Sequence, residues 1–269
     1  MNYLKKYPEG YGLKNVVPFM EAGLKKSAFD ILKLKANEKH EGNTGEFESA
    51  FVILSGTCSI SGEGFEYENI GSRKDVFSGK PTAVYLPCHS GYEVVAVTDL
   101  EIAVCSAKSD LKSSPLLIKP SDVKEVELGV LTWSRKAFFV IDQDVNAQCL
   151  FLGETHLAPG KWAFPPHRHD KDNFPEEIDM EEIYHFRMKP SSGFGIQLSY
   201  TDDRSRHEAY LLREGDTVII PNGYHPVSAS PVDSLYLLWF MAGDKRMFLS
   251  RPEDNYKWLL NCESLIKSI

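Results

Sequence analysis

Short apolar segments separated by turn residues run through the whole chain. Seven of them are rich in Val, Ile, Phe, Tyr and Leu, and they span residues 51–54, 83–86, 92–97, 137–141, 195–200, 217–220 and 234–240. Such segments, with turn signals at roughly ten-residue spacing, are typical of antiparallel strands in sandwiches or barrels, whereas strands alternating with helices would indicate a parallel sheet. The pattern therefore predicts an all-β fold with few helices.

One helix is expected, close to the end of the chain. Ser250 stands where an N-cap residue would stand, and Glu253 has the spacing of its capping-box partner. Apolar residues at positions 256, 259, 260 and 266 then fall near one face. We expect this helix to pack on a barrel.

The length of the chain indicates two β units. Its 269 residues exceed one small barrel and suit two units of roughly 110–130 residues each. Residues 113–127 contain two prolines and mixed charges, so they are the best candidate for the connection. We expect an N-terminal barrel in residues 1–120, and a C-terminal barrel with the helix in residues 121–269.

A faint internal repeat supports this division. Residues 51–56 are followed by 83–87 in the first half, and residues 182–186 by 217–221 in the second. The later segment of each pair ends at a Pro just before a Gly-containing turn. The repeat indicates a duplicated β unit.

Charge and hydropathy exclude several classes of partner. The net charge is −8, and no cluster of Lys and Arg is dense enough to follow a nucleic-acid backbone. The basic N-terminus has no apolar core behind it, as a secretory signal would have. No segment approaches the ~18 consecutive apolar residues of a membrane span. We therefore expect a cytoplasmic protein with a small-molecule partner, neither nucleic acid nor membrane, and the sequence leaves a homo-oligomer open.

The strongest local motif is a His-x-His after two prolines. On an extended strand, His167 and His169 point to the same face, so two imidazoles can converge on one ion. Downstream, Glu182 opens an apolar strand, and residues 215–225 form a turn, a strand, a second turn and then His225.

This order of residues resembles the two cupin motifs. In cupins a His-x-His and a Glu come from the first motif and a single His comes from the second. The resemblance implies that His167, His169, Glu182 and His225 bind one metal ion. Three imidazoles and one carboxylate suit a divalent Zn, Mn, Fe, Co or Ni ion. The first half contains no His-x-His, so we expect its barrel to be degenerate.

The carboxylate ligand has rivals, because twelve residues separate His169 from Glu182 where cupins have three or four. The rivals in this acidic segment are Glu176, Glu177 and Glu181. Glu182 is preferred because it alternates with Tyr184 and Phe186, which places all three side chains inside the barrel. By the same alternation His185 should face away from the metal.

Several blocks between residues 153 and 243 are similar to the 5-deoxy-glucuronate isomerases of myo-inositol catabolism. They comprise residues 165–170, 172–177, 181–184, 200–205, 221–226 and 241–243. The first half resembles this family more loosely. The resemblance implies a bicupin fold and an aldose-ketose isomerase that converts 5-deoxy-D-glucuronate to 5-dehydro-2-deoxy-D-gluconate. A divalent ion that chelates the aldehyde and the neighbouring hydroxyl would stabilise the developing enediolate.

The remaining catalytic roles are less constrained. Tyr184 beside Glu182 and Glu177 on the acidic segment are the candidate acid/base groups. The candidate cations for the substrate carboxylate are Arg204, Arg187 and Arg213. Arg204 ranks first because it lies in a block shared with the family, although a salt bridge to the neighbouring Asp202 or Asp203 would explain it equally well.

Three other functions stay open. The related uronate ketol-isomerases of pectin breakdown share the bicupin plan, so the substrate could be a different sugar acid. A cupin with three His and one Glu could also be a metal-dependent dioxygenase. A sugar-binding module without catalysis is the third alternative.

Overall fold

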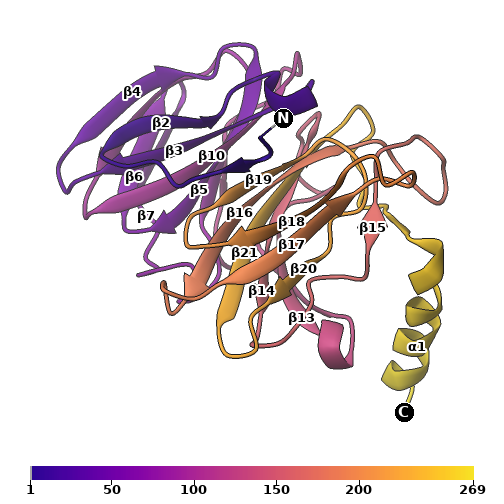
Figure 1. The fold of residues 1–269 in the computed structure, drawn as a ribbon. Coiled ribbons are helices and arrows are strands. Elements are labelled where there is room, and N and C mark those ends of the chain that lie inside the picture. Colours follow the sequence, from indigo (N-terminus) through magenta and orange to yellow (C-terminus); the bar gives the residue numbers. More distant parts are fainter. Residues whose placement is uncertain (1) are drawn as a thin grey trace.

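Antiparallel strands build nearly the whole molecule, in two halves that lie side by side (Figure 1). The computed structural model describes residues 2–269. Each of the seven apolar segments named above lies on a strand, to within one residue. The prediction of an all-β fold with a short C-terminal helix is confirmed.

The N-terminal half consists of a six-stranded and a four-stranded sheet. The larger sheet contains, in spatial order, β11 (Leu116–Ile118), β8 (Ala83–Leu86), β5 (Phe47–Ser55), β10 (Leu100–Lys108), β3 (Ser27–Leu34) and β2 (Gly12–Val17). The smaller sheet contains β4 (Lys39–Asn43), β9 (Gly91–Ala96), β6 (Cys58–Gly62) and β7 (Phe65–Ile70).

The C-terminal half repeats this plan with a seven-stranded and a three-stranded sheet. The larger sheet contains β1 (Leu4–Lys5), β19 (Thr217–Ile220), β16 (Glu181–Lys189), β21 (Ser234–Ala242), β14 (Leu150–Leu157), β13 (Arg135–Ile141) and β12 (Lys124–Leu128). The smaller sheet contains β18 (His207–Leu212), β17 (Gly195–Tyr200) and β20 (Val227–Ala229). A separate two-stranded ladder joins β15 (His167–Arg168) to β22 (Arg251–Pro252).

Corresponding strands occupy corresponding places in the two large sheets. The order β8-β5-β10-β3 in the first matches β19-β16-β21-β14 in the second. The edges differ in origin, because β11 pairs with β8 within its own half whereas β1, from the start of the chain, pairs with β19. The strand order supports the duplicated β unit, while the division at residue 120 stays a prediction.

Side chains alternate across the two large sheets and so separate three apolar cores among the described residues. Along β21, Leu237 and Trp239 point into the C-terminal barrel. Their neighbours Leu238 and Phe240 point the other way and join Phe29 in a core shared by both halves. A further core fills the N-terminal barrel. The shared core makes the two barrels one body.

Buried polar groups also tie the halves together. Arg73 pairs with Glu154 at 2.6 Å, with side chains 4% and 0% exposed, and the Tyr236 hydroxyl donates to the same carboxylate at 2.8 Å. Glu181 Oε1 accepts hydrogen bonds from the backbone N–H and hydroxyl of Ser27, both at 2.6 Å. These contacts fix the C-terminal barrel against the N-terminal sheet.

The C-terminal helix differs from the prediction. Helix α1 (Trp258–Lys267) begins beyond a 3-10 turn, η3 (Asp254–Tyr256), and has no side-chain cap. The expected capping box is wrong, because Ser250 lies in a pocket wall and Glu253 accepts a hydrogen bond from the Tyr200 hydroxyl at 2.5 Å.

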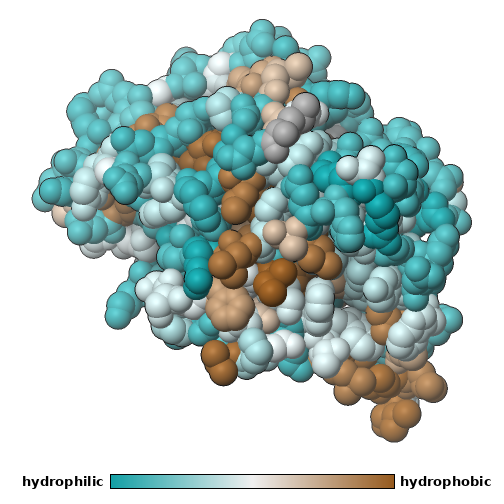
Figure 2. Space-filling model, in the orientation of Figure 1, coloured by the Kyte–Doolittle hydropathy of each residue, from teal (hydrophilic) through white to brown (hydrophobic). Residues whose placement is uncertain are grey.

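No residue of α1 is buried, and the helix contacts the C-terminal half only at its edge, where Glu263 accepts a hydrogen bond from the Gly129 N–H at 3.0 Å. Figure 2 shows apolar residues gathered at the lower right, where α1 lies in Figure 1. Two further 3-10 turns are η1 (Glu21–Gly23) and η2 (Leu131–Trp133). Among residues 2–269, none of the helices combines the length and the apolar character that crossing a membrane would require.

Candidate metal centre and active-site pocket

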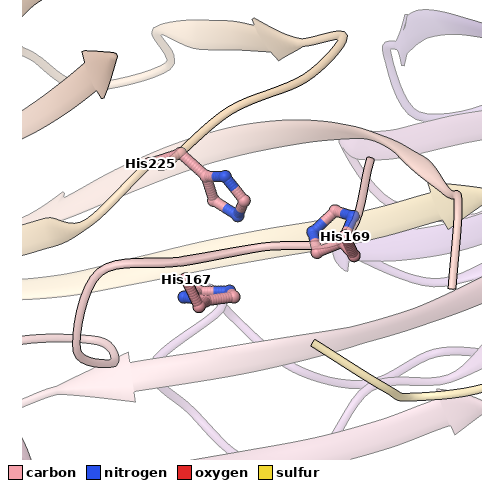
Figure 3. A group of neighbouring side chains, drawn as sticks. All are labelled: His167, His169 and His225. Carbon is pink, nitrogen blue, oxygen red and sulfur yellow. The ribbon is translucent and has the colours of Figure 1, made fainter. Parts of the chain in front are cut away.

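Four side chains chosen from the sequence converge inside the C-terminal barrel. His167 lies on β15, His169 just after it, Glu182 on β16 and His225 in the turn between β19 and β20. Figure 3 shows the three imidazoles around a common point, and one nitrogen of each lies within 4.8 Å of the others. Glu182 Oε2 is 3.1 Å from Nε2 of both His169 and His225.

Backbone carbonyls fix the protonation of each imidazole. The Nδ1 atoms of His167, His169 and His225 lie 3.0, 2.6 and 2.9 Å from the carbonyl oxygens of Pro165, Met180 and Gly223. A carbonyl oxygen can only accept, so each Nδ1 carries the proton and each Nε2 presents a lone pair. Donating the second ring nitrogen to a carbonyl is the usual arrangement of metal-binding histidines.

The electrostatics of the cluster favour a bound cation. Burial opposes the charge on Glu182, yet His169 and His225, when protonated, outweigh it and lower the pKa of Glu182 to about 2, and a metal cation in their place would act in the same direction. Burial, followed by the two other imidazoles, holds the pKa of His167 well below its ordinary value. The Nε2 atom of His225 is buried and has no hydrogen-bond partner among the described residues. A carboxylate facing imidazole lone pairs is a donor set that fits a divalent metal ion.

A glycine turn positions the last histidine. Gly223 has φ +81°, and a Cβ there would lie 2.6 Å from the carbonyl oxygen of Tyr200, so a side chain would force the turn to move. The Gly223 N–H donates to Asp170 Oδ2 at 2.7 Å. This bond joins the segment of His225 to the residue that follows His169.

The rival carboxylates lie outside the cluster. Glu177 is fully buried, where it accepts a hydrogen bond from the Asp170 N–H at 2.9 Å and faces Arg168 Nε at 3.4 Å. It therefore packs behind the histidine segment and does not line the pocket, so the structure does not support it as an acid/base group. Glu176 is exposed, and Glu181 binds the N-terminal half.

None of the three predicted arginines lines the pocket. Arg204 is exposed and pairs with Glu253 at 2.9 Å, in place of the aspartates beside it. Arg187 lies on the opposite face of β16 and pairs with Glu101. Arg213 donates to the carbonyl of Gly193 at 3.2 Å. The three arginines are close to the motifs in sequence. The pairing of the strands nevertheless places them outside the pocket.

The pocket above the cluster contains groups that sequence reasoning missed. Beyond the four clustered residues its walls include Tyr184, Arg135, Phe164, Trp239 and Phe248. Tyr184 was expected there, and burial followed by the Glu182 carboxylate raises its pKa well above the ordinary value. Arg135 was not expected, although it alternates with inward-facing Phe139 on β13.

The alternation along β16 separates the pocket from its surroundings. His185 has the parity opposite to Tyr184, and its ring lies 5.3 Å from that of Phe29 in the shared core. Its Nδ1 lies 3.0 Å from the hydroxyl of Thr217. His185 is thus a packing residue outside the cluster of His167, His169, Glu182 and His225.

Comparison with known proteins identifies the family of the chain. Residues 11–259 match the KduI/IolB family. The chain belongs to this family. A protein of Geobacillus thermodenitrificans named 5-deoxy-glucuronate isomerase is 36% identical over 248 residues, which cover 91% of this chain and 90% of that protein.

Solved structures agree with the fold of this KduI/IolB family member. An IolB-like protein from Salmonella typhimurium LT2 superimposes with a TM-score of 0.92 at 32% identity, covering 97% of this chain and 100% of that one. Oxalate decarboxylase of Lactobacillus farciminis matches with a TM-score of 0.67 at 13% identity, covering 100% of this chain and 93% of that one, and this likeness shows the fold alone. The expected bicupin fold is confirmed.

Proposed function

We propose that this protein is an aldose-ketose isomerase that converts 5-deoxy-D-glucuronate to 5-dehydro-2-deoxy-D-gluconate. The observation that carries the proposal is the buried cluster of three imidazoles and Glu182 at the base of a pocket. It occurs in a chain 36% identical to a protein named for this isomerase. Family membership and site chemistry thus support the same reaction.

His167, His169, Glu182 and His225 would hold one divalent ion. Such an ion supplies Lewis acidity to the substrate carbonyl and the adjacent hydroxyl, which makes the C2 proton easier to remove. The protein holds the ligand atoms for this ion in place. The backbone carbonyls orient the three imidazoles, and Glu182 contributes one negative charge.

Tyr184 is the proposed acid/base group of the pocket. A tyrosine hydroxyl is protonated at neutral pH, and the raised pKa of Tyr184 keeps it so in this pocket, where it can donate to an oxygen of the substrate. Its place beside Glu182 puts this proton next to the metal cluster. Trp239 and Phe248 cover the same space with apolar surface, which keeps bulk water from the reacting carbons.

The test is an assay of the purified protein with 5-deoxy-glucuronate, with metal content measured on the same sample. We expect turnover without oxygen uptake and about one ion per chain. His225→Ala should lose metal and activity while staying folded, because the barrel cores are apolar. His207→Ala, at an exposed position on β18, is the matched control and should keep both. Oxygen consumption without isomerisation would instead establish a dioxygenase.

A further inference from the structure

A buried guanidinium forms part of the pocket wall. Arg135 begins β13, where its side chain is on the same face of the strand as Phe139, which packs against Trp239 in the C-terminal barrel. Arg135 is 8% exposed and lines the pocket together with Tyr184 and the metal cluster. The strand thus carries a permanent positive charge into a largely apolar space.

Among residues 2–269, no carboxylate forms an ion pair with this guanidinium, and the Glu263 carboxylate acts on it only at longer range. The hydrogen bond of Arg135 among the described residues goes from Nη1 to the carbonyl of Trp133 at 3.3 Å. The other arginines with similar burial are paired, Arg73 with Glu154, Arg168 with Asp202 and Arg187 with Glu101. Burying an unpaired charge is costly, so an unpaired guanidinium at a pocket wall is a site for an anion.

The protonation state of Arg135 agrees with an anion-binding site. Burial lowers the pKa of Arg135 to about 10, against the smaller opposing effects of Glu263 and Tyr184. The guanidinium therefore still carries its charge at neutral pH. It also lies over the ring of Phe164, 4.7 Å from the ring centre, and Phe164 in turn contacts His167 edge-on at 4.7 Å between ring centres.

We propose that Arg135 binds the carboxylate of the sugar acid and so selects uronates over neutral aldoses. The inference rests on the proposed function, because a uronate has its reacting carbonyl at one end and its carboxylate at the other. The ring of Phe164 lies between the guanidinium and His167. One substrate can therefore place its carboxylate at Arg135 and its reacting carbonyl at the metal-binding residues. The planar fork of Arg matches a carboxylate in two parallel hydrogen bonds.

The kinetic test compares wild type, Arg135→Lys and Arg135→Met on 5-deoxy-glucuronate and on 5-deoxy-glucose, in which a hydroxymethyl group replaces the carboxylate. We expect Arg135→Met to lower kcat/KM for the acid by about 30-fold or more, chiefly through KM. The rate on the neutral sugar should hardly change, and Arg135→Lys should recover part of the loss. Arg204→Met, which removes an exposed arginine paired with Glu253, is the matched control.

A stability measurement separates binding from a structural role. Because Arg135→Met removes an unpaired buried charge, its melting temperature should equal or exceed that of wild type. Equal losses on both sugars, no loss on the acid, or a lower melting temperature together with lost activity would each overturn the proposal.

A binding arm distinguishes failure of this inference from failure of the proposed function. Wild type that does not isomerise 5-deoxy-glucuronate would refute the function alone. Calorimetric titration of the metal-free protein with D-gluconate and D-glucitol would then decide the inference. Preference for gluconate that disappears in Arg135→Met supports a carboxylate site, and equal binding of both compounds by wild type refutes it.

Discussion

Two adjacent carboxylates on β16 allow a sharp test of the site. Glu182 faces the three imidazoles, and Glu181, on the other face of the strand, binds the N-terminal half. Changing each to Gln preserves shape and removes one negative charge. If the interpretation of the strand is right, one variant should lose metal and the other should lose stability.

The magnitudes follow from the contacts. Glu181 Oε1 accepts three hydrogen bonds, from the N–H of Lys26 at 2.8 Å and from the N–H and hydroxyl of Ser27, and Oε2 accepts one from the Lys25 N–H at 2.7 Å. A Gln amide has one acceptor oxygen, so one donor is left facing an NH₂ group. We expect a loss of about 1–3 kcal/mol, or roughly 2–12 °C in melting temperature.

Glu182→Gln should instead act on the metal. Even the residues that support metal ligands change affinity by about 10–100-fold when mutated, so loss of a direct anionic donor should reduce affinity by at least that much. Isomerase activity should fall with occupancy. Glu176→Gln, at an exposed position, is the matched control and should change neither property.

The assay measures metal per chain by emission spectrometry and the melting temperature by circular dichroism. Melting is also measured with chelator, because bound metal would otherwise contribute to the stability of some variants and not of others. In chelator, Glu181→Gln should melt below Glu182→Gln. Full metal occupancy in Glu182→Gln together with a metal-free Glu181→Gln would refute the reasoning.

Three further outcomes are expected. Arg73→Met should cost about 3–5 kcal/mol, because Glu154 is left buried and unpaired, and adding Glu154→Met should recover most of it in urea denaturation. Gly223→Ala should cost about 1–3 kcal/mol and weaken metal binding, whereas Gly160→Ala, with a similar φ of +72° but open space around its Cβ, should leave titrated metal affinity unchanged. Burial, then the charges of two basic neighbours, lowers the pKa of His185 below its ordinary value of 6.5. The unfolded chain therefore binds a proton there that the folded chain does not, and stability should fall below that pH by up to about 1.4 kcal/mol per pH unit. His185→Leu should remove this part of the slope in denaturation curves measured at each pH.

Local patterns in the sequence account for the fold and for the centre of the site. Strand alternation and turn residues act over a few positions, so they can be seen directly along the chain. The same alternation distinguished Glu182 from Glu181 and placed His185 on the far face, because a side chain on a strand has only two directions to choose from.

The rest of the pocket depends on pairings between distant strands. Arg135 reaches the pocket because β13 pairs with β14, and β14 with β21, and no local pattern encodes this neighbourhood. The wall formed by Phe248 depends in the same way on the pairing of β22 with β15. The predicted N-cap at Ser250 is wrong because residues 251 and 252 pair in that ladder, so the helix begins only at Trp258.

The pairing of β1 with β19 also bears on the order in which the protein can fold during synthesis. Leu4 pairs with Val218 and Lys5 with Thr217, so strand β1 has its partner more than 200 residues downstream. At roughly 5–20 residues per second, the ribosome delivers that partner about 10–40 s later. The N-terminal barrel can close on its own edge strand, β11, during this interval. The sheet that carries Glu182 is completed only after β19 and β21 have been translated.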